Sequence, residues 1–223
     1  AGGERLDAVA TGSTGQLLAK ALSAPHVNEL ACLAAATARL HPEVATIFDM
    51  GGEDAKCISL KDGVIRDFAL NSVCAAGTGS FLDQQAERMR LSVEEFARLG
   101  LESAHPPQVA GRCSVFAKSD MIHLQQIATP VADIIAGLSF AVARNFKGAI
   151  VRGRPTPPPV AFMGGVALNE SVVRAFREVF DLPYLLIPEN PCHMGAIGAV
   201  LLARDKGLGV PLDRAGLEAL DSA

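Results

Sequence analysis

Apolar and polar residues alternate along the chain in a pattern that predicts short buried strands separated by longer helices. Short apolar runs bounded by glycine, proline or acidic residues have the length of strands, and they span residues 7–10, 45–49, 160–163 and 184–187. Longer periodic stretches predict helices at residues 16–22, 28–40, 80–90, 129–151, 169–180 and 193–204. Two further helices are predicted by one end each: one begins at residue 92, and another ends at residue 126. Because strands and helices follow one another in turn, the pattern predicts an α/β fold.

Local signals fix several ends of these elements. Asn28 stands where it can cap the second helix, and Ser92 is followed three residues later by Glu95, which is the sequence of a capping box. Asp62 and Gly63 separate two further strand-like runs, residues 56–60 and 64–69, and this pair favours a two-residue hairpin turn.

Composition narrows the class of protein. The chain has 223 residues, 49% apolar and 20% charged, which is enough for a sizeable core in one large domain or two small ones. The net charge of -4, without a basic run, argues against a nucleic-acid partner. We expect no membrane span and no signal peptide, because no apolar stretch looks long enough and the first residues lack an apolar segment.

The five cysteines stand at positions 32, 57, 74, 113 and 192. Their number is odd, their spacings are wide and no Cys-x-x-Cys pair occurs, so a disulfide framework or a self-contained zinc site is not indicated. We therefore expect a cytoplasmic protein. The chain does not begin with methionine, which suggests a fragment or a processed protein.

Two glycine-rich stretches carry candidate chemistry. Residues 71–82 combine Cys74 with Gly77-Thr78-Gly79 just before a predicted helix, where backbone N–H groups can face an anion. Asp49-Met50-Gly51-Gly52 follows a strand, so its backbone can approach a phosphate while the acid holds hydrated magnesium. Taken alone, each stretch also fits a plain tight turn, with Cys74 as a small buried residue.

The order of these motifs resembles the actin-like ATPases, and one branch of them matches best. Residues 49–56 (Asp-Met-Gly-Gly-Glu-Asp-Ala-Lys), 74–83, 113–117 and 163–169 are similar to motifs of the activators of 2-hydroxyacyl-CoA dehydratases and of the benzoyl-CoA reductase ATPase subunits. The resemblance runs from about residue 11 to residue 204. It implies an actin-like ATPase fold and an ATP-driven electron-transfer activator that reduces a partner dehydratase or CoA-ester reductase.

The resemblance also implies a role for particular residues. Cys74 and Cys113 would be one subunit's ligands to a 4Fe–4S cluster shared across a homodimer, and each precedes a predicted helix start, which favours a thiolate. Asp49 would hold Mg2+ through water, and Glu29 would orient water, although its place in a first helical turn explains it equally well. The phosphates and the nucleoside of ATP would be bound by Gly51, Gly52, Gly77, Thr78 and Gly79, and by Gly164, Gly165 and Val166.

The chain departs from the family pattern in one major respect. The first phosphate hairpin, an Asp-x-Gly-Ser/Thr turn, is not found, so we expect residues 1–40 to be a remnant of the first lobe and 41–223 to be the second lobe. The isolated chain would then bind ATP poorly and show little ATPase activity. Two alternatives stay open: a cluster-free nucleotide-binding regulatory module of a larger protein, and a small-molecule kinase of the same superfamily, which would leave the paired cysteine motifs unexplained.

Overall fold

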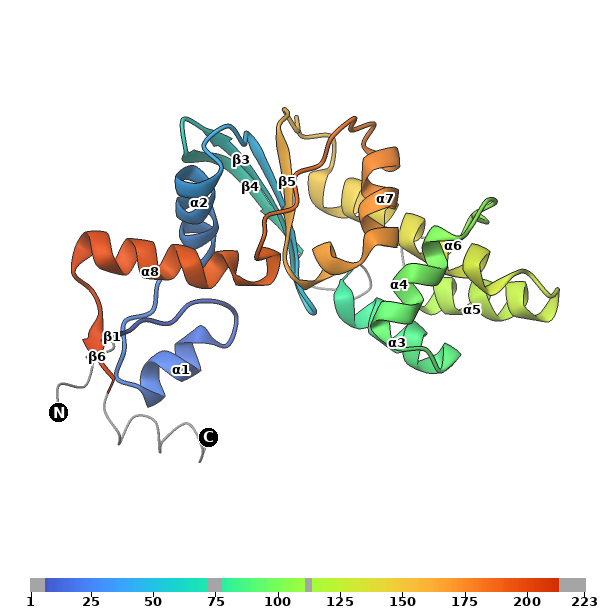
Figure 1. The fold of residues 1–223 in the computed structure, drawn as a ribbon, viewed down its shortest axis with the longest axis horizontal. Coiled ribbons are helices and arrows are strands. Elements are labelled where there is room, and N and C mark those ends of the chain that lie inside the picture. Colours follow the sequence, from blue (N-terminus) through green and yellow to red (C-terminus); the bar gives the residue numbers. More distant parts are fainter. Residues whose placement is uncertain (1–6, 72–77, 111–113, 213–223) are drawn as a thin grey trace. The chain divides into compact units, whose positions relative to one another are not determined.

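The computed structural model describes residues 7–71, 78–110 and 114–212 (Figure 1). Within these residues the chain forms two compact units. Unit 1 comprises residues 7–44, 60–65 and 193–212, and unit 2 comprises residues 45–59 and 66–192 where they are described. The division into lobes at residue 40 stays a prediction, because compactness alone does not define a lobe of this fold.

A four-stranded sheet organises unit 2, although residues 60–65, at the hairpin end of β3 and β4, belong to unit 1. It is formed by β2 (Thr46–Met50), β3 (Ala55–Lys61), β4 (Val64–Leu70) and β5 (Val160–Met163) in the order β4-β3-β2-β5. Strand β2 is antiparallel to β3 and parallel to β5, with Asp49 opposite Lys56 on one side and Met163 on the other. Every residue of β2 is buried, as expected for a central strand covered on both faces.

The strands predicted at 45–49, 56–60, 64–69 and 160–163 are confirmed, and the strand predicted at 7–10 is confirmed only over Asp7–Ala8. Asp62 and Gly63 both have positive φ, 53° and 75°, as a two-residue hairpin turn requires. The predicted strand at 184–187 is wrong, because only Leu186 pairs, through an isolated parallel bridge to Ala161. Pro183 and Pro188 flank this segment, and a proline cannot donate to a ladder, so the pairing stays short.

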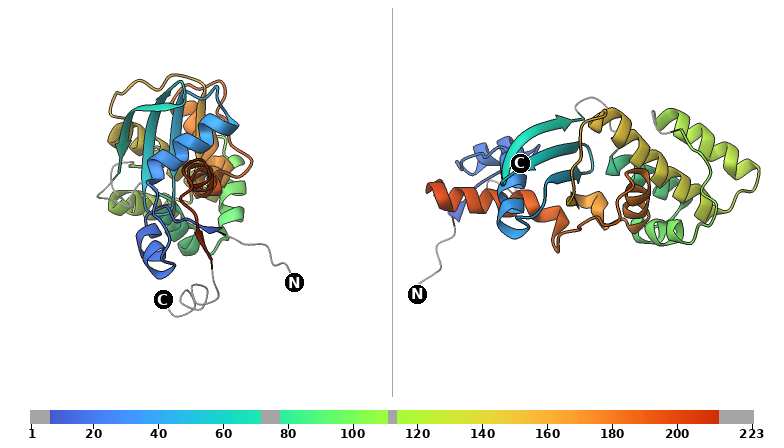
Figure 2. Two further views of the ribbon diagram at one scale, coloured as in Figure 1. Left: turned by 90° about the vertical axis from the view of Figure 1, so that its left-hand side faces the viewer. Right: turned by 90° about the horizontal axis from the view of Figure 1, so that it is seen from above.

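The helices of unit 2 follow the predicted map closely. They are α3 (Gly79–Met89), α4 (Val93–Leu101), α5 (Ser114–Gln126), α6 (Val131–Asn145), the π-helix η2 (Phe146–Val151), the 3-10 helix η3 (Gly165–Leu168) and α7 (Glu170–Val179). Helix α6 packs against α4, α5 and α7 (Figures 1 and 2). The capping box is confirmed: Glu95 N–H donates to Ser92 Oγ at 3.1 Å, and Ser92 N–H donates to Glu95 Oε2 at 2.9 Å.

Phenylalanine rings join the sheet of unit 2 to its helices. Phe48 of β2 lies 5.0 Å from Phe146 between ring centroids, and Phe162 of β5 stacks on Phe176 of α7 at 4.5 Å. All four side chains are fully buried. Large aromatic side chains contribute most of the apolar area of such a core, so this cluster holds η2 and α7 against β2 and β5.

The segment Val131–Val151 corrects an expectation drawn from the sequence. It forms one continuous helix of 21 residues, which is long and apolar enough to cross a membrane by length and composition. The expectation that no stretch reaches that length is therefore wrong. Because 67% of its most apolar part is buried inside the described structure, packing in the core of unit 2 accounts for the apolar composition of this helix.

Two helices cross closely in unit 1. Its elements are β1 (Asp7–Ala8), α1 (Gly15–Ala21), α2 (Glu29–Leu40), α8 (Met194–Lys206), which follows the 3-10 turn η4 (Pro191–His193), and β6 (Val210–Pro211), which is antiparallel to β1. Asn28 caps α2 as predicted, accepting from Ala31 N–H at 3.2 Å. At the crossing of α2 and α8, a Cβ on Gly198 would lie 1.8 Å from the carbonyl oxygen of Cys32. Glycine is thus required for this contact.

Candidate functional site

Two glycine turns meet at the end of β2. Gly79 N–H donates to the carbonyl oxygen of Gly51 at 2.9 Å, and Ser80 N–H donates to that of Gly52 at 2.8 Å. These bonds dock the first turn of α3 onto the turn that follows β2. A Cβ on Gly79 would lie only 3.2 Å from the Gly52 Cα, so glycine permits the approach.

The third turn, after β5, reaches the same place. Gly164 has φ 87° and ψ 171°, a conformation reserved for glycine, and a Cβ there would lie 2.3 Å from the carbonyl oxygen of Met50. A side-chain carbon of Val166 lies 3.1 Å from the position of a Cβ built on Gly79. Since β2 and β5 are parallel, their carboxyl ends share one edge of the sheet, which is where α/β folds bind ligands.

A pocket of about 340 Å³ opens beside the three turns. Its size falls within the range of small-molecule sites. The turns supply one wall, helices α3 and α4 supply the other, and the lining residues are Gly52, Gly79, Leu82, Asp83, Ala86, Val93, Glu94, Phe96, Ala97, Gly165, Val166, Leu168 and Asn169. The lining thus combines apolar side chains with a few polar ones.

An ion-paired lysine lies at the base of the first turn. Lys56 Nζ lies 3.1 Å from Asp49 Oδ2 and 2.7 Å from Asp54 Oδ2, and the Lys56 and Asp49 residues are 4% and 6% exposed. Carboxylate oxygens suit Mg2+, which commonly keeps several waters and takes further ligands from phosphates. In the described part of the chain, no group of three or more His, Cys, Asp or Glu residues lies together. The role of Asp49 toward a metal stays a prediction.

The structure brings together most of the predicted nucleotide-binding residues. Gly51, Gly52, Gly79, Gly164, Gly165 and Val166 all lie in the turns of unit 2 just described. Thr78 precedes α3 and is fully buried, and Glu29 begins α2 in unit 1. Gly77, Cys74 and Cys113 lie outside the described residues. The chemical roles of all these residues stay predictions.

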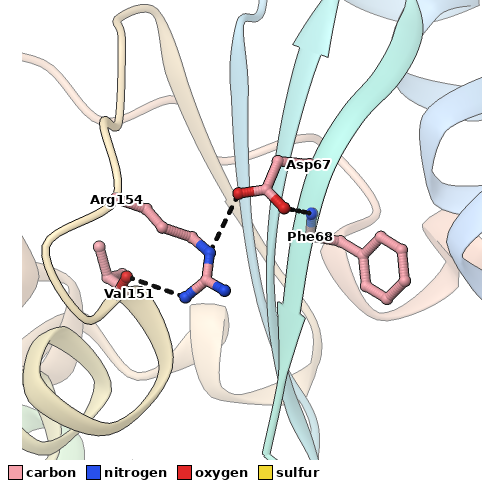
Figure 3. A network of polar contacts seen from close by, with 4 residues as sticks. All are labelled: Asp67, Phe68, Val151 and Arg154. Atoms are coloured by element: carbon pink, nitrogen blue, oxygen red, sulfur yellow. Dashed lines mark hydrogen bonds and ion pairs between the residues drawn. The ribbon is translucent and has the colours of Figure 1, made fainter.

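Two of the remaining cysteines lie in surroundings that disfavour a thiolate. Burial raises the pKa of Cys57 to about 11, and a smaller opposing effect comes from Arg154. Arg154 Nε itself pairs with Asp67 Oδ2 at 3.0 Å, tying the proline-rich connector to β4 (Figure 3). Burial also raises the pKa of Cys32, although a hydrogen bond from Thr11 opposes it. Because metal ligation needs the thiolate, both observations support a structural role for Cys32 and Cys57.

Sequence reasoning missed two parts of this site. Lys56 is the last residue of the motif at 49–56, and no function was predicted for it. Only the antiparallel register of β2 and β3 places it opposite Asp49. The wall formed by Phe96 and Ala97 was also missed. The capping box at Ser92 predicted the helix that carries them, but no local signal shows which pocket a helix face lines.

Comparisons with known proteins agree with this architecture. The model of the BadF/BadG/BcrA/BcrD ATPase family matches residues 3–203. The 2-hydroxyisocaproyl-CoA dehydratase activator of Clostridioides difficile is 36% identical over 182 residues, which cover 81% of this chain and 67% of that protein.

Two solved structures show the same fold. Component A of the (R)-2-hydroxyglutaryl-CoA dehydratase from Acidaminococcus fermentans has a TM-score of 0.84 at 32% identity, covering 90% of this chain and 76% of that one. The activator of the 2-hydroxyisocaproyl-CoA dehydratase from Clostridium difficile, with bound ADPNP, has a TM-score of 0.81 at 30% identity, covering 97% and 76%. The predicted actin-like ATPase fold and the predicted family are confirmed: this chain belongs to the BadF/BadG/BcrA/BcrD ATPase family.

Proposed function

We propose that this chain acts as an ATP-dependent activator that reduces a partner 2-hydroxyacyl-CoA dehydratase or a related CoA-ester reductase. The observation that carries the proposal is the meeting of three glycine turns beside one pocket in a chain of this ATPase family. Among the relatives named above, the 2-hydroxyisocaproyl-CoA dehydratase protein is an activator, and its structure was solved with bound ADPNP.

In this proposal the turns of unit 2 bind the nucleotide. The turn at Gly51 and Gly52 and the N-terminal end of α3 would face the phosphates, where the positive end of the helix dipole favours negative charge. The N–H groups of Gly51, Gly79 and Ser80 hold these turns together by donating to backbone carbonyl oxygens. The apolar part of the pocket, which includes Leu82 and Phe96, would receive the nucleoside. Asp49 would orient water around a Mg2+ ion that arrives with the phosphates.

The cluster ligands in this proposal are Cys74 and Cys113. The described structure supports the choice only indirectly: α3 begins at Gly79, five residues after Cys74, and α5 begins at Ser114, directly after Cys113. The positive end of a helix lowers the pKa of a nearby thiol and so favours a ligating thiolate. A 4Fe–4S cluster bound there would supply one low-potential electron. The two cysteines of each subunit would complete four ligands in a cytoplasmic homodimer.

Iron incorporation tests the ligand assignment. After anaerobic reconstitution, Cys74→Ser and Cys113→Ser should each lose the iron and the visible absorbance that the parent protein gains. Cys57→Ser is the matched control and should reconstitute like the parent, since its thiol is buried and its pKa is raised. If the Cys74→Ser protein binds as much iron as the parent, the assignment is wrong, and the cluster-free regulatory module becomes the better description.

The dimer is tested by its dependence on the cluster. A ligand shared by two subunits stabilises the dimer, because it binds that state and not the separated chains. Removal of iron with a chelator should therefore shift the reconstituted protein toward the monomer in light scattering. An unchanged mass in samples with no remaining iron would contradict a bridging cluster.

A further inference from the structure

Lys56 has no role in the proposed function, although its ammonium lies at the base of the first glycine turn of the candidate site. It is the register partner of Asp49 across β2 and β3, and its side chain is 5% exposed. A lysine is rarely buried to this extent unless its charge is compensated. Its ammonium therefore belongs to the charge balance of the site.

The ammonium of Lys56 bridges the two ends of the first glycine turn. Asp49 precedes the turn in the sequence and Asp54 follows it. Lys56 Nζ lies 3.1 Å from Asp49 Oδ2 and 2.7 Å from Asp54 Oδ2. Gly51 N–H closes the turn by donating to the carbonyl oxygen of Asp54 at 2.9 Å. The lysine thus fixes the two carboxylates on either side of Gly51 and Gly52.

These three groups together carry two negative charges and one positive charge. A divalent cation drawn to Asp49 without phosphates would have to approach the ammonium, which repels it. When the metal arrives with a nucleotide, the phosphate oxygens add negative charge that offsets this repulsion. The same ammonium therefore has opposite effects on the free metal and on the metal–nucleotide complex.

We propose that Lys56 is a built-in counterion of the phosphate turn, which lowers the affinity of the site for free Mg2+ so that the metal binds with the nucleotide. Lys56 is then a positioning residue that acts through Asp49 and Asp54. This inference rests on the proposed function in two respects, the placement of the nucleotide phosphates at this turn and the placement of Mg2+ beside Asp49. A purely structural role for Lys56 would predict weaker binding of both metal and nucleotide once it is replaced.

Binding of Mn2+ alone distinguishes the two roles. Mn2+ has the same preference for oxygen ligands as Mg2+, and its free form is measured directly by electron paramagnetic resonance. In the absence of nucleotide, Lys56→Met should bind Mn2+ about tenfold more tightly than the parent, because a repelling charge that lies 3.1 Å from Asp49 Oδ2 is removed. Lys61→Met is the matched control: it removes the same charge from an exposed position of β3 and should leave the affinity unchanged.

Two more variants keep the test independent of folding. Lys56→Arg retains the charge and should retain the weak binding of Mn2+. The double variant Lys56→Met with Asp54→Asn restores the original sum of charges, so its affinity should return close to that of the parent. Equal or weaker binding of Mn2+ by Lys56→Met, or tight binding by the parent itself, would overturn the counterion role. Because no nucleotide is present, this result is separate from any failure of nucleotide binding.

Discussion

Replacement of Gly164 by alanine should weaken both the fold of unit 2 and the candidate site. Gly164 has φ 87°, and a Cβ would lie 2.3, 2.6 and 2.9 Å from the O, C and N atoms of Met50. These atoms belong to the backbone of β2, so no change of rotamer relieves the overlap. The turn after β5 must therefore move away from the end of β2.

The expected magnitude follows from two contributions. Alanine in a conformation reserved for glycine costs about 1–3 kcal/mol, and overpacking against a rigid neighbour costs about 1–3 kcal/mol more. The sum of about 2–6 kcal/mol is a large share of the roughly 5–15 kcal/mol that stabilises a typical domain. Gly148→Ala is the control, because its Cβ would meet nothing within 4 Å, and its effect should stay within about 1 kcal/mol.

Urea unfolding followed by circular dichroism measures the difference. We expect the midpoint of Gly164→Ala to fall by about 1 M urea or more, while Gly148→Ala unfolds close to the parent. A midpoint for Gly164→Ala equal to that of the control would refute the reasoning, since it would show that β2 and the turn after β5 are not in the contact described.

Two further perturbations test other parts of the structure. Gly198→Ala should separate α2 from α8, because its Cβ would lie 1.8 Å from the Cys32 carbonyl oxygen. Gly195→Ala in the same helix is the control, because its Cβ would meet nothing within 4 Å. Thermal unfolding should show a lower midpoint only for Gly198→Ala, although alanine has the better helix propensity at both positions. The hydrogen bond from Ser103 Oγ to Asp133, 2.6 Å long, lowers the pKa of that carboxyl, so its contribution to stability is present above the unfolded pKa and is lost as pH falls through the lower folded pKa. Ser103→Ala should raise the pKa of Asp133 in an NMR titration and remove the stability that this carboxyl contributes above its unfolded pKa, and an unchanged pKa would contradict the assignment.

Local chemistry explains which parts of the fold could be predicted from the sequence. Asn28 and the Ser92–Glu95 capping box accept hydrogen bonds from helix N–H groups three residues away. The starts of these two helices can therefore be predicted from the sequence without tertiary context. Asp62-Gly63 determines its own turn through positive φ at both positions. The glycines of the candidate site belong to the same class, because the need for an uncrowded backbone is visible in the residue itself.

Tertiary context explains what could not be predicted. The segment around Leu186 has a strand-like composition, but the prolines beside it leave room for only a bridge. The apolar helix Val131–Val151 has the composition of a membrane span and is buried in the core of unit 2. The bridge from Lys56 to Asp54 depends on the register of β2 and β3, which no single motif specifies.

The central claim, that the three glycine turns bind a nucleotide, is tested most directly by titration of the labelled protein with Mg2+ and ADP in 1H–15N correlation spectra. This measurement suits weak binding, since it detects complexes with dissociation constants of about 1 mM. The account predicts that the largest shifts fall on the amides of Gly52, Gly79, Gly165 and Val166, and that they saturate together. Shifts confined to other parts of the chain, or no shift of these four amides at roughly millimolar ADP, would contradict it.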